Sequence, residues 1–264
     1  MSLTDTHCHL DIEYFDADRD AVLARAWATG LDRILIPALD VVSCRRVLAL
    51  TETDPRLFAA IGVHPNSAKT WDDTTLDTLR ELASYPKVVA IGEIGLDYHW
   101  DFAPKEMQHP VLRAQLELAA ELRLPVVIHN RDSTEDVQEI LLDWQAELAA
   151  SGNPLAERPG VLHSYSGGAK AAQKAIAANF YLGVTGPVTF KNAPELQSLI
   201  SILPLSNLLI ETDAPYLAPH PNRGKRNEPA YVKLVAEKIA DLKVVSFEEV
   251  ARQTRENADQ LFGW

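Results

Sequence analysis

The sequence predicts an α/β fold, a (β/α)₈ TIM barrel, formed by a single domain that spans residues 1–264 and carries additional C-terminal helices. Three observations support this prediction. The chain has 264 residues, and one such barrel typically needs about 250. Short apolar segments rich in β-branched residues alternate with segments of helical periodicity. Polar residues follow many of the apolar segments, as they do at the carboxyl ends of the strands in barrel enzymes.

Eight apolar segments are predicted to be strands. They are continuously apolar, which is typical of parallel strands buried on both faces. The weakest is the first, at the N-terminus. The predicted strands are Leu3–Asp5, Ile34–Ile36, Phe58–Val63, Val88–Ile91, Val126–Ile128, Val161–Leu162, Tyr181–Val184 and Leu208–Ile210.

The segments between these strands have helical spacing. The predicted helices are Asp20–Trp27, Val42–Leu50, Thr75–Ala83, Glu106–Leu122, Thr134–Leu148, Ala169–Ala178 and Glu195–Leu203. Residues Ala230–Leu261 are expected to form two more helices packed on the barrel, the second beginning near Ser246 with Glu249 completing a capping box. No Gly-x-Gly-x-x-Gly turn follows the first strand, so a dinucleotide-binding fold has little support.

The composition is that of a globular protein, with 47% hydrophobic and 23% charged residues. The N-terminus lacks a basic region followed by an apolar run, and no segment approaches the roughly 20 apolar residues that span a bilayer, so we expect a cytoplasmic location and no membrane partner. Cys8 and Cys44 are too few for a disulfide framework and are expected to be small buried hydrophobic residues. We expect a monomer, with an oligomer left open.

The formal charge of −12 weighs against a surface built for non-specific nucleic-acid binding, which depends on Lys and Arg. If nucleic acid is the substrate, the contact must be local. One local cluster of cations is present at Arg223–Arg226.

Six histidines and carboxylates stand at the ends of predicted strands and are candidate metal ligands. They are His7, His9, Glu93, His129, His163 and Asp213. His7 and His9 are two residues apart, so their side chains project to the same face of the chain, although such a pair alone could equally be two hydrogen-bonded surface histidines. Charged groups beside a core are costly unless something compensates them, and a bound cation would compensate all of these together. The sequence therefore predicts one metal site.

The ligand types suit zinc, manganese, iron or nickel, and magnesium where carboxylates, water and substrate phosphate dominate. Six ligands exceed what one tetrahedral zinc needs, so we expect two divalent ions, Mg, Mn or Zn, with Glu93 as the bridge. Such a pair of ions supports hydrolysis without a protein nucleophile. Asp213 is expected to be catalytic with Glu93, both binding metal and accepting the proton of the attacking water.

Three further side chains are candidate substrate contacts, each with an alternative. His64, in Gly62–Pro65, either contacts substrate or caps backbone groups. Arg131 either binds a phosphate of the substrate or forms an ordinary surface salt bridge. The Arg223–Arg226 cluster carries the same kinds of phosphate-binding group. Tyr165 either stacks a base or simply packs.

These motifs resemble the TatD family of metal-dependent deoxyribonucleases, within the amidohydrolase superfamily. The resemblance runs from Asp5 to the C-terminal helices. It rests on Asp5–Asp11, Gly62–Pro65, Ile91–Asp97, Pro125–Arg131, Glu211–Pro215 and Arg223–Pro229. It implies a TIM barrel, a dinuclear divalent-metal site and hydrolysis of phosphodiester bonds in DNA, with 3′-to-5′ exonuclease activity the commonest assignment.

The resemblance also implies roles for individual residues. His7, His9 and Asp213 would bind the first metal, Glu93 would bridge, and His129 and His163 would bind the second. The residues that look like substrate contacts are His64, Arg131, Arg223, Lys225, Arg226, Asn227 and Glu228. The chain departs from the family pattern at Ser133 and at Ser164-Tyr165, which leaves substrate preference more open than the fold.

Two other functions compete with a nuclease. The first is a metal-dependent hydrolase of a small phosphoester, amide or lactone, because related barrels act on many substrates. Most relatives of that kind place a lysine where Glu93 stands, which favours the nuclease, whereas the acidic charge of the chain favours the alternative. The second is a non-catalytic binding protein, against which the complete set of ligands argues. DNA against RNA, strandedness, and exonuclease against endonuclease stay open.

Overall fold

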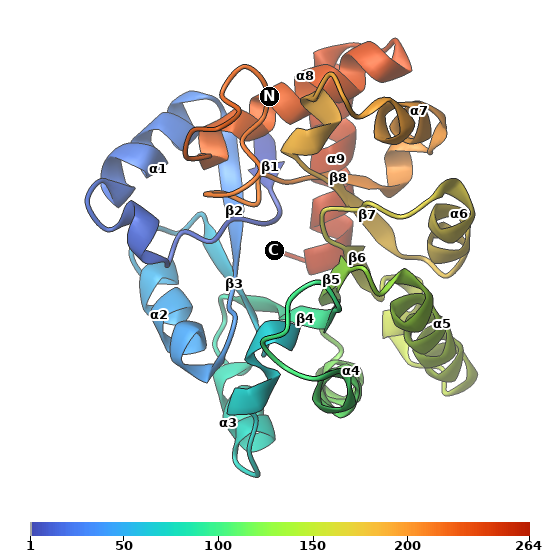
Figure 1. Ribbon diagram of the computed structural model, residues 1–264. Coiled ribbons are helices and arrows are strands. Elements are labelled where there is room, and N and C mark those ends of the chain that lie inside the picture. Colours follow the sequence, from blue (N-terminus) through green and yellow to red (C-terminus); the bar gives the residue numbers. More distant parts are fainter. Residues whose placement is uncertain (1) are drawn as a thin grey trace.

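A barrel of parallel strands forms the centre of the molecule in the computed structural model, which describes residues 2–264. The strands pair in chain order, and Figure 1 looks along the barrel axis. They are β1 Leu3–Asp5, β2 Leu31–Pro37, β3 Leu57–Ile61, β4 Val88–Asp97, β5 Val126–Arg131, β6 Gly160–Leu162, β7 Tyr181–Val184 and β8 Leu208–Ile210. The predicted barrel is confirmed.

Helices form a ring around the strands (Figure 1). They are α1 Arg19–Ala28, α2 Val41–Thr51, α3 Thr75–Leu82, α4 Lys105–Leu122, α5 Thr134–Ala150, α6 Ala169–Ala177, α7 Pro194–Ile202, α8 Val232–Lys243 and α9 Phe247–Phe262. One helix follows each strand, and α9 is the additional one. Among residues 2–264, no helix combines the length and the apolar character that crossing a bilayer requires.

The first and last strands meet at a seam that nearly closes the barrel. The Thr6 N–H donates to the Ile210 carbonyl at 3.2 Å, and Cys8 and Ala214 form an isolated parallel bridge. The buried Asp5 carboxylate accepts from the backbone N–H of Thr212 at 2.9 Å and from its hydroxyl at 2.6 Å. These contacts join β1 to β8 next to the predicted ligands.

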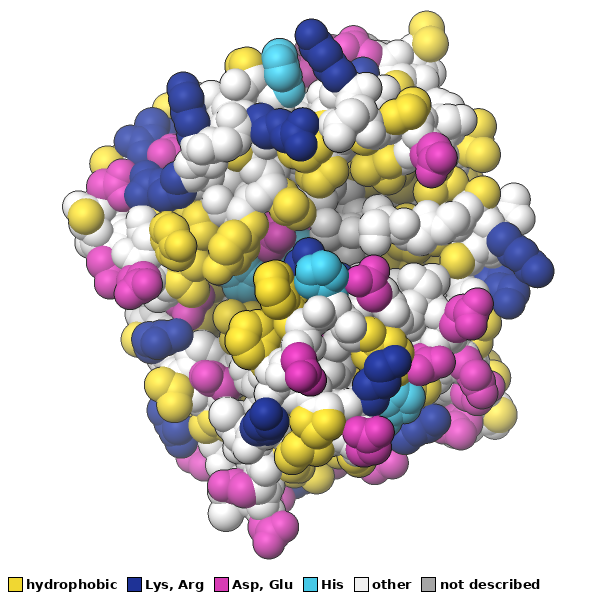
Figure 2. Space-filling model, in the orientation of Figure 1, with side chains coloured by type: hydrophobic (Ala, Val, Ile, Leu, Met, Phe, Trp, Pro, Cys, Tyr) yellow, Lys and Arg dark blue, Asp and Glu magenta, His cyan; other side chains and the backbone are white. Residues whose placement is uncertain are grey.

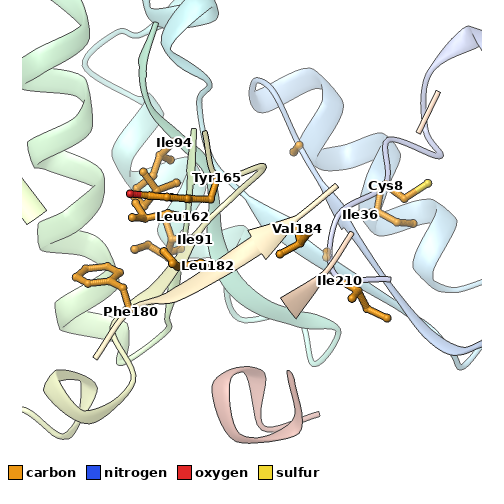
Figure 3. Packing of buried hydrophobic residues seen from close by; sticks show 14 of the residues in the cluster. Cys8, Ile36, Ile91, Ile94, Leu162, Tyr165, Phe180, Leu182, Val184 and Ile210 are labelled. Carbon is orange, nitrogen blue, oxygen red and sulfur yellow. The ribbon is translucent and has the colours of Figure 1, made fainter. Parts of the chain in front are cut away.

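The core has two parts. The larger part lies mainly between the strands and the surrounding helices, and Figure 3 shows a portion of it. The smaller part fills the lower interior of the barrel, where Leu35, Val127 and Leu209 pack with Leu261 and Phe262 from the end of α9. The last helix therefore closes the end of the barrel opposite the carboxyl ends of the strands.

Strand β4 is longer than the predicted Val88–Ile91. It continues to Asp97 because Ile94 and Gly95 pair with β5, after a shift in register. Gly95 has φ +149°, and a Cβ at this position would lie 1.9 Å from the His129 carbonyl oxygen. Only glycine fits there, and Glu93 consequently lies inside the strand and not at its end.

Two smaller predictions have different outcomes. Cys8 and Cys44 are buried free thiols, as expected. Helix α9 has Ser246 as its N-cap, whose hydroxyl accepts from the Glu249 N–H at 3.1 Å. The Glu249 carboxylate pairs with Arg252 at 2.8 Å, so the reciprocal half of the capping box was predicted wrongly.

Candidate metal centre

The six predicted ligands come together at the carboxyl ends of five strands. His7 and His9 follow β1, His163 follows β6 and Asp213 lies three residues beyond β8, whereas Glu93 and His129 belong to β4 and β5. All except Asp213 and His129 are less than a tenth exposed. Figure 2 shows this face of the molecule, where histidine and acidic side chains are visible in a central hollow.

Four of these side chains aim single atoms at one point. The Nε2 atoms of His7 and His9 are 3.2 Å apart, and Glu93 Oε2 lies 3.4 Å from the first and 3.7 Å from the second. Asp213 Oδ1 lies 3.8 Å from His7 Nε2 and 3.5 Å from His9 Nε2. Ligand atoms about 2.1 Å from one ion in a tetrahedral arrangement lie about 3.4 Å from one another. The spacing of these four atoms fits a divalent metal ion.

A second set of donors lies on the other side of Glu93. Its Oε1 atom is 2.9 Å from His129 Nδ1 and 3.9 Å from His64 Nε2. Two ligands at right angles around an ion lie about 3 Å apart, so Glu93 Oε1 and His129 Nδ1 also fit a metal. The single carboxylate of Glu93 thus presents one oxygen to each set of histidines.

Two carboxylates each contact one ring nitrogen of a predicted histidine ligand. The Asp97 Oδ2 atom is 3.0 Å from His129 Nε2, and Glu211 Oε2 is 2.8 Å from His163 Nδ1. Metal-binding histidines usually donate their second ring N–H to such a carboxylate, which fixes the tautomer and leaves the other nitrogen free for the ion. Neither Asp97 nor Glu211 was predicted to be functional, although each lies in a sequence motif that contains a predicted ligand.

The electrostatics follow from this mixture of imidazoles and carboxylates. Burial lowers the pKa of His129, but Asp97 and Glu93 outweigh it and raise that pKa to about 9. Burial also lowers the pKa of His163, but the Glu211 carboxylate outweighs this effect and the pKa rises to about 9. Burial would raise the pKa of Glu93, but the surrounding histidines hold it well below its usual range. Without an ion, the positive charge that Glu93 requires is carried by protonated imidazoles, and a cation can take their place.

His163 lies beside the first set of ligands. Its ring stacks on that of His7 with centroids 3.4 Å apart, and its Nε2 is 3.7 Å from Asp213 Oδ1. The expected partnership of His163 with His129 at a second metal therefore remains a prediction.

His64 caps backbone groups, and its contact with substrate stays a prediction. Its Nδ1 accepts from the Asn66 N–H at 3.1 Å, which caps a short 3₁₀ helix, while Nε2 faces Glu93. Burial and the neighbouring His129 lower the pKa of His64 to about 3. The ring is therefore neutral with its proton on Nε2, so it offers a hydrogen bond to the site.

Tyr165 packs in the core. It is 6% exposed, shares a small cavity with Leu162 and Phe180, and donates its hydroxyl to the Gly168 carbonyl at 3.0 Å (Figure 3). Of the two roles predicted for Tyr165, the structure shows the packing role. Its ring does not lie on the surface of the site.

The stretch from Arg223 to Glu228 divides into two groups. Arg226 and Glu228 form an ion pair with each other at 3.0 Å. Arg226 also pairs with Asp18, and Glu228 also pairs with Arg25. Asn227 is fully buried and donates to two backbone carbonyls. These three side chains hold the loop in place. The Arg223 and Lys225 side chains are exposed, and Arg223 donates to Asn192 and lies over the Phe190 ring.

Arg131 is also exposed and ends β5 beside the site, where its guanidinium lies 5.6 Å from the centre of the Trp100 ring. Among the predicted phosphate contacts, Arg131, Arg223 and Lys225 are exposed, whereas Arg226 is half-buried and paired with Asp18 and Glu228.

Barrel architecture and this convergence of histidines and carboxylates define the class of protein, a metal-dependent hydrolase. A family model described as TatD related DNase matches residues 4–263, and the chain belongs to this family. It is 47% identical to "Uncharacterized metal-dependent hydrolase YabD" of Bacillus subtilis, over 98% of each chain. It is 35% identical to "3'-5' ssDNA/RNA exonuclease TatD" of Escherichia fergusonii, again over 98% of each. Among solved structures, YJJV, a TatD homolog from Escherichia coli, superposes with a TM-score of 0.91 at 34% identity, covering 99% of this chain and 98% of that one.

Proposed function

We propose that this hydrolase is a 3′-to-5′ exonuclease that acts on DNA, with RNA as a second substrate, and that it uses two divalent ions. The observation that carries the proposal is the position of Glu93, whose two oxygens face separate sets of histidines at 3.4 Å and 2.9 Å. A bridging carboxylate between two ions is typical of enzymes that hydrolyse phosphodiester bonds. Relatives named as exonucleases, 35% identical over nearly the whole chain, support the substrate class.

In this proposal His7, His9 and Asp213 hold one ion, and His129 with His163 holds the other. Metal analysis of the loaded protein is therefore expected to give two equivalents per chain. At most one equivalent at saturating metal would contradict the bridging role of Glu93.

The ions, when bound, would polarise the phosphoryl group and lower the pKa of the attacking water. Asp213 is the residue that would take the proton of that water on its carboxylate. Burial raises the pKa of Asp213, but His9, His163 and His7 together hold it below its usual value, so the group is ionised and can accept a proton at neutral pH. It is partly exposed, with 15% of the side chain accessible, as contact with a substrate requires.

Three cations and a neutral imidazole would hold the substrate. Arg131, Arg223 and Lys225 would bind phosphates that flank the scissile bond, because an exposed guanidinium or ammonium without a buried carboxylate partner is available to an anion. The Nε2 proton of His64 would be donated to an oxygen of the substrate.

The test is shortening of a 5′-labelled single-stranded oligonucleotide with Mg²⁺, Mn²⁺ or Zn²⁺. Wild type should produce a ladder that shortens from the 3′ end, and Glu93→Gln and Asp213→Asn should lose at least about 100-fold in rate, as expected for groups at the reacting centre. Glu121→Gln, which removes a surface carboxylate paired with Arg80, is the matched control. No cleavage by metal-replete wild type would overturn the proposal in favour of the hydrolase of small phosphoesters, amides or lactones.

A further inference from the structure

Exposed aromatic side chains gather around the mouth of the barrel. Among residues 2–264, five Phe, Trp or Tyr side chains are exposed, and four of them lie in segments that follow strands. These four are Tyr14 at 58%, Trp100 at 47%, Phe102 at 58% and Tyr216 at 50%. The fifth, Tyr85, precedes β4 at the opposite end of the barrel. Figure 2 shows hydrophobic side chains on two sides of the central hollow. Folding does not explain this arrangement, because the exposed rings leave apolar surface in water.

Tyr216 stands next to the first set of ligands. Its ring centroid is 6.2 Å from that of His9, and its backbone N–H donates to the Asp213 carbonyl at 2.8 Å. The Asn227 side chain binds the Tyr216 carbonyl at 2.7 Å, and Tyr14 lies edge-on at 6.5 Å. The backbone of Tyr216 is therefore held in place, and its half-exposed ring lies beside the metal centre.

Trp100 stands next to the second set. The Asp97 carboxylate that contacts His129 through Oδ2 accepts from the Trp100 N–H through Oδ1 at 3.1 Å. One carboxylate thus fixes both the histidine and the loop that carries the indole. Arg131 lies over the Trp100 ring and Phe102 lies beside it, with ring centroids 5.9 Å apart.

The two aromatic groups lie across the barrel from each other. Tyr14 and Tyr216 belong to the loops after β1 and β8, and Trp100 belongs to the loop after β4. In a barrel of eight strands paired in chain order, these positions are opposite, with the ligands between them.

We propose that Tyr216 and Trp100 are stacking surfaces for unpaired bases on the two sides of the scissile phosphate. The inference rests on the nuclease function proposed above. Aromatic rings stack on any base, because every base has a π-face, but they reach it only when the base is not stacked and paired in a duplex. Stacking also supplies affinity that does not depend on phosphate contacts, which suits a chain with a net charge of −12.

The first experiment measures binding without metal. The full-length protein in EDTA is titrated into a fluorescently labelled single-stranded oligonucleotide, and the dissociation constant is obtained from anisotropy. Tyr216→Leu and Trp100→Leu should each weaken binding by about 5- to 100-fold, the value of one lost base–aromatic stack. Tyr85→Leu, which removes an equally exposed aromatic ring at the other end of the barrel, should bind as wild type does.

A second substrate identifies the base as the partner of the rings. It carries abasic tetrahydrofuran residues at its two 3′-terminal positions. Wild type should bind and cleave it with the deficit that a Tyr216→Leu, Trp100→Leu double variant shows on the normal strand, and on this substrate the leucine variants should bind no more weakly than wild type does. Wild type should also cleave a single strand faster than a blunt duplex with the metal present.

The outcomes separate this inference from the nuclease proposal. Cleavage by wild type with unchanged binding and KM in Tyr216→Leu and Trp100→Leu would overturn the stacking role alone. A loss that persists on the abasic strand, or that appears equally in Tyr85→Leu, would overturn it as well. No cleavage by metal-replete wild type would overturn the nuclease proposal and the stacking role with it.

Discussion

Replacing Asp97 by asparagine is expected to weaken metal binding through a change of tautomer in His129. The Asp97 Oδ1 atom accepts from the N–H groups of His99 and Trp100, and Oδ2 accepts from His129 Nε2 and the Asn66 amide. Both positions therefore require an acceptor. An aspartate supplies two acceptor oxygens, whereas an asparagine supplies one.

The two backbone donors are fixed, so the amide oxygen of the variant should stay with them and its NH₂ should face His129. The ring then has to accept at Nε2 and carry its proton on Nδ1, the atom that faces Glu93 Oε1 at 2.9 Å and is expected to bind metal. Loss of such an orienting carboxylate typically costs 10- to 100-fold in metal affinity, or about 1.4 to 2.7 kcal/mol. Only one of the two expected ions should be affected.

The assay is calorimetric titration of the metal-free protein with Mn²⁺ or Zn²⁺, with thermal unfolding as the check on folding. Asp132→Asn is the control, because Asp132 makes a similar 3.0 Å contact with His99, where both side chains are exposed and neither is a predicted ligand. If Asp97→Asn binds two ions with wild-type affinities, the orienting role is refuted.

Three more predictions concern pH and stability. His129 and His163 have pKa values raised from 6.5 to about 9, so in the metal-free protein their contribution to stability is complete below about pH 6.5 and is lost as the pH rises through 9. Urea unfolding in EDTA should show lower stability at pH 9.5 than at pH 6, and an equal or higher value would contradict the assigned charges. Gly183→Ala should reduce metal affinity, because its Cβ would lie 2.2 Å from Glu211 Oε2 and displace the partner of His163; calorimetry unchanged from wild type would disprove this. Glu228→Gln should lower the free energy of unfolding by about 1 to 3 kcal/mol, through weakened bonds to two arginines, and leave metal binding intact; denaturation with the same midpoint would exclude a structural role.

The sequence predicted the barrel because strand and helix periodicity are local properties. The bounds of β1, β7 and β8 agree with the prediction, whereas β4 was predicted six residues too short. In the sequence, the glycines at 92 and 95 and the charged Glu93 are typical of a strand end. The strand continues through them because β5 pairs with residues beyond Glu93, and no pattern within the segment reveals that pairing.

The same limit applies to the site. Histidines and carboxylates at strand ends could be recognised one by one, but the contacts of Asp97 and Glu211 with them depend on neighbouring strands. In the loops, residue type gave no measure of burial. Base stacking was one of two roles predicted for Tyr165, which is buried, while none was predicted for Tyr216, which is half-exposed. In the same way, the sequence around Arg226 does not reveal that this arginine pairs with Asp18, which lies 208 residues away.

If the proposed ligands hold an ion, the seam between β1 and β8 would link metal supply to the lifetime of the protein. His7 and His9 stand on one side of it and Asp213 on the other, joined by the bond from the Asp213 N–H to the His7 carbonyl at 2.8 Å. An ion held by all three, as proposed, would clamp the first strand to the last. At 100 times its dissociation constant such an ion adds about 2.7 kcal/mol to the folded state. Without the ion the seam keeps only its hydrogen bonds, so we expect a metal-free chain to unfold more readily and the amount of enzyme in a cell to fall with the supply of its metal.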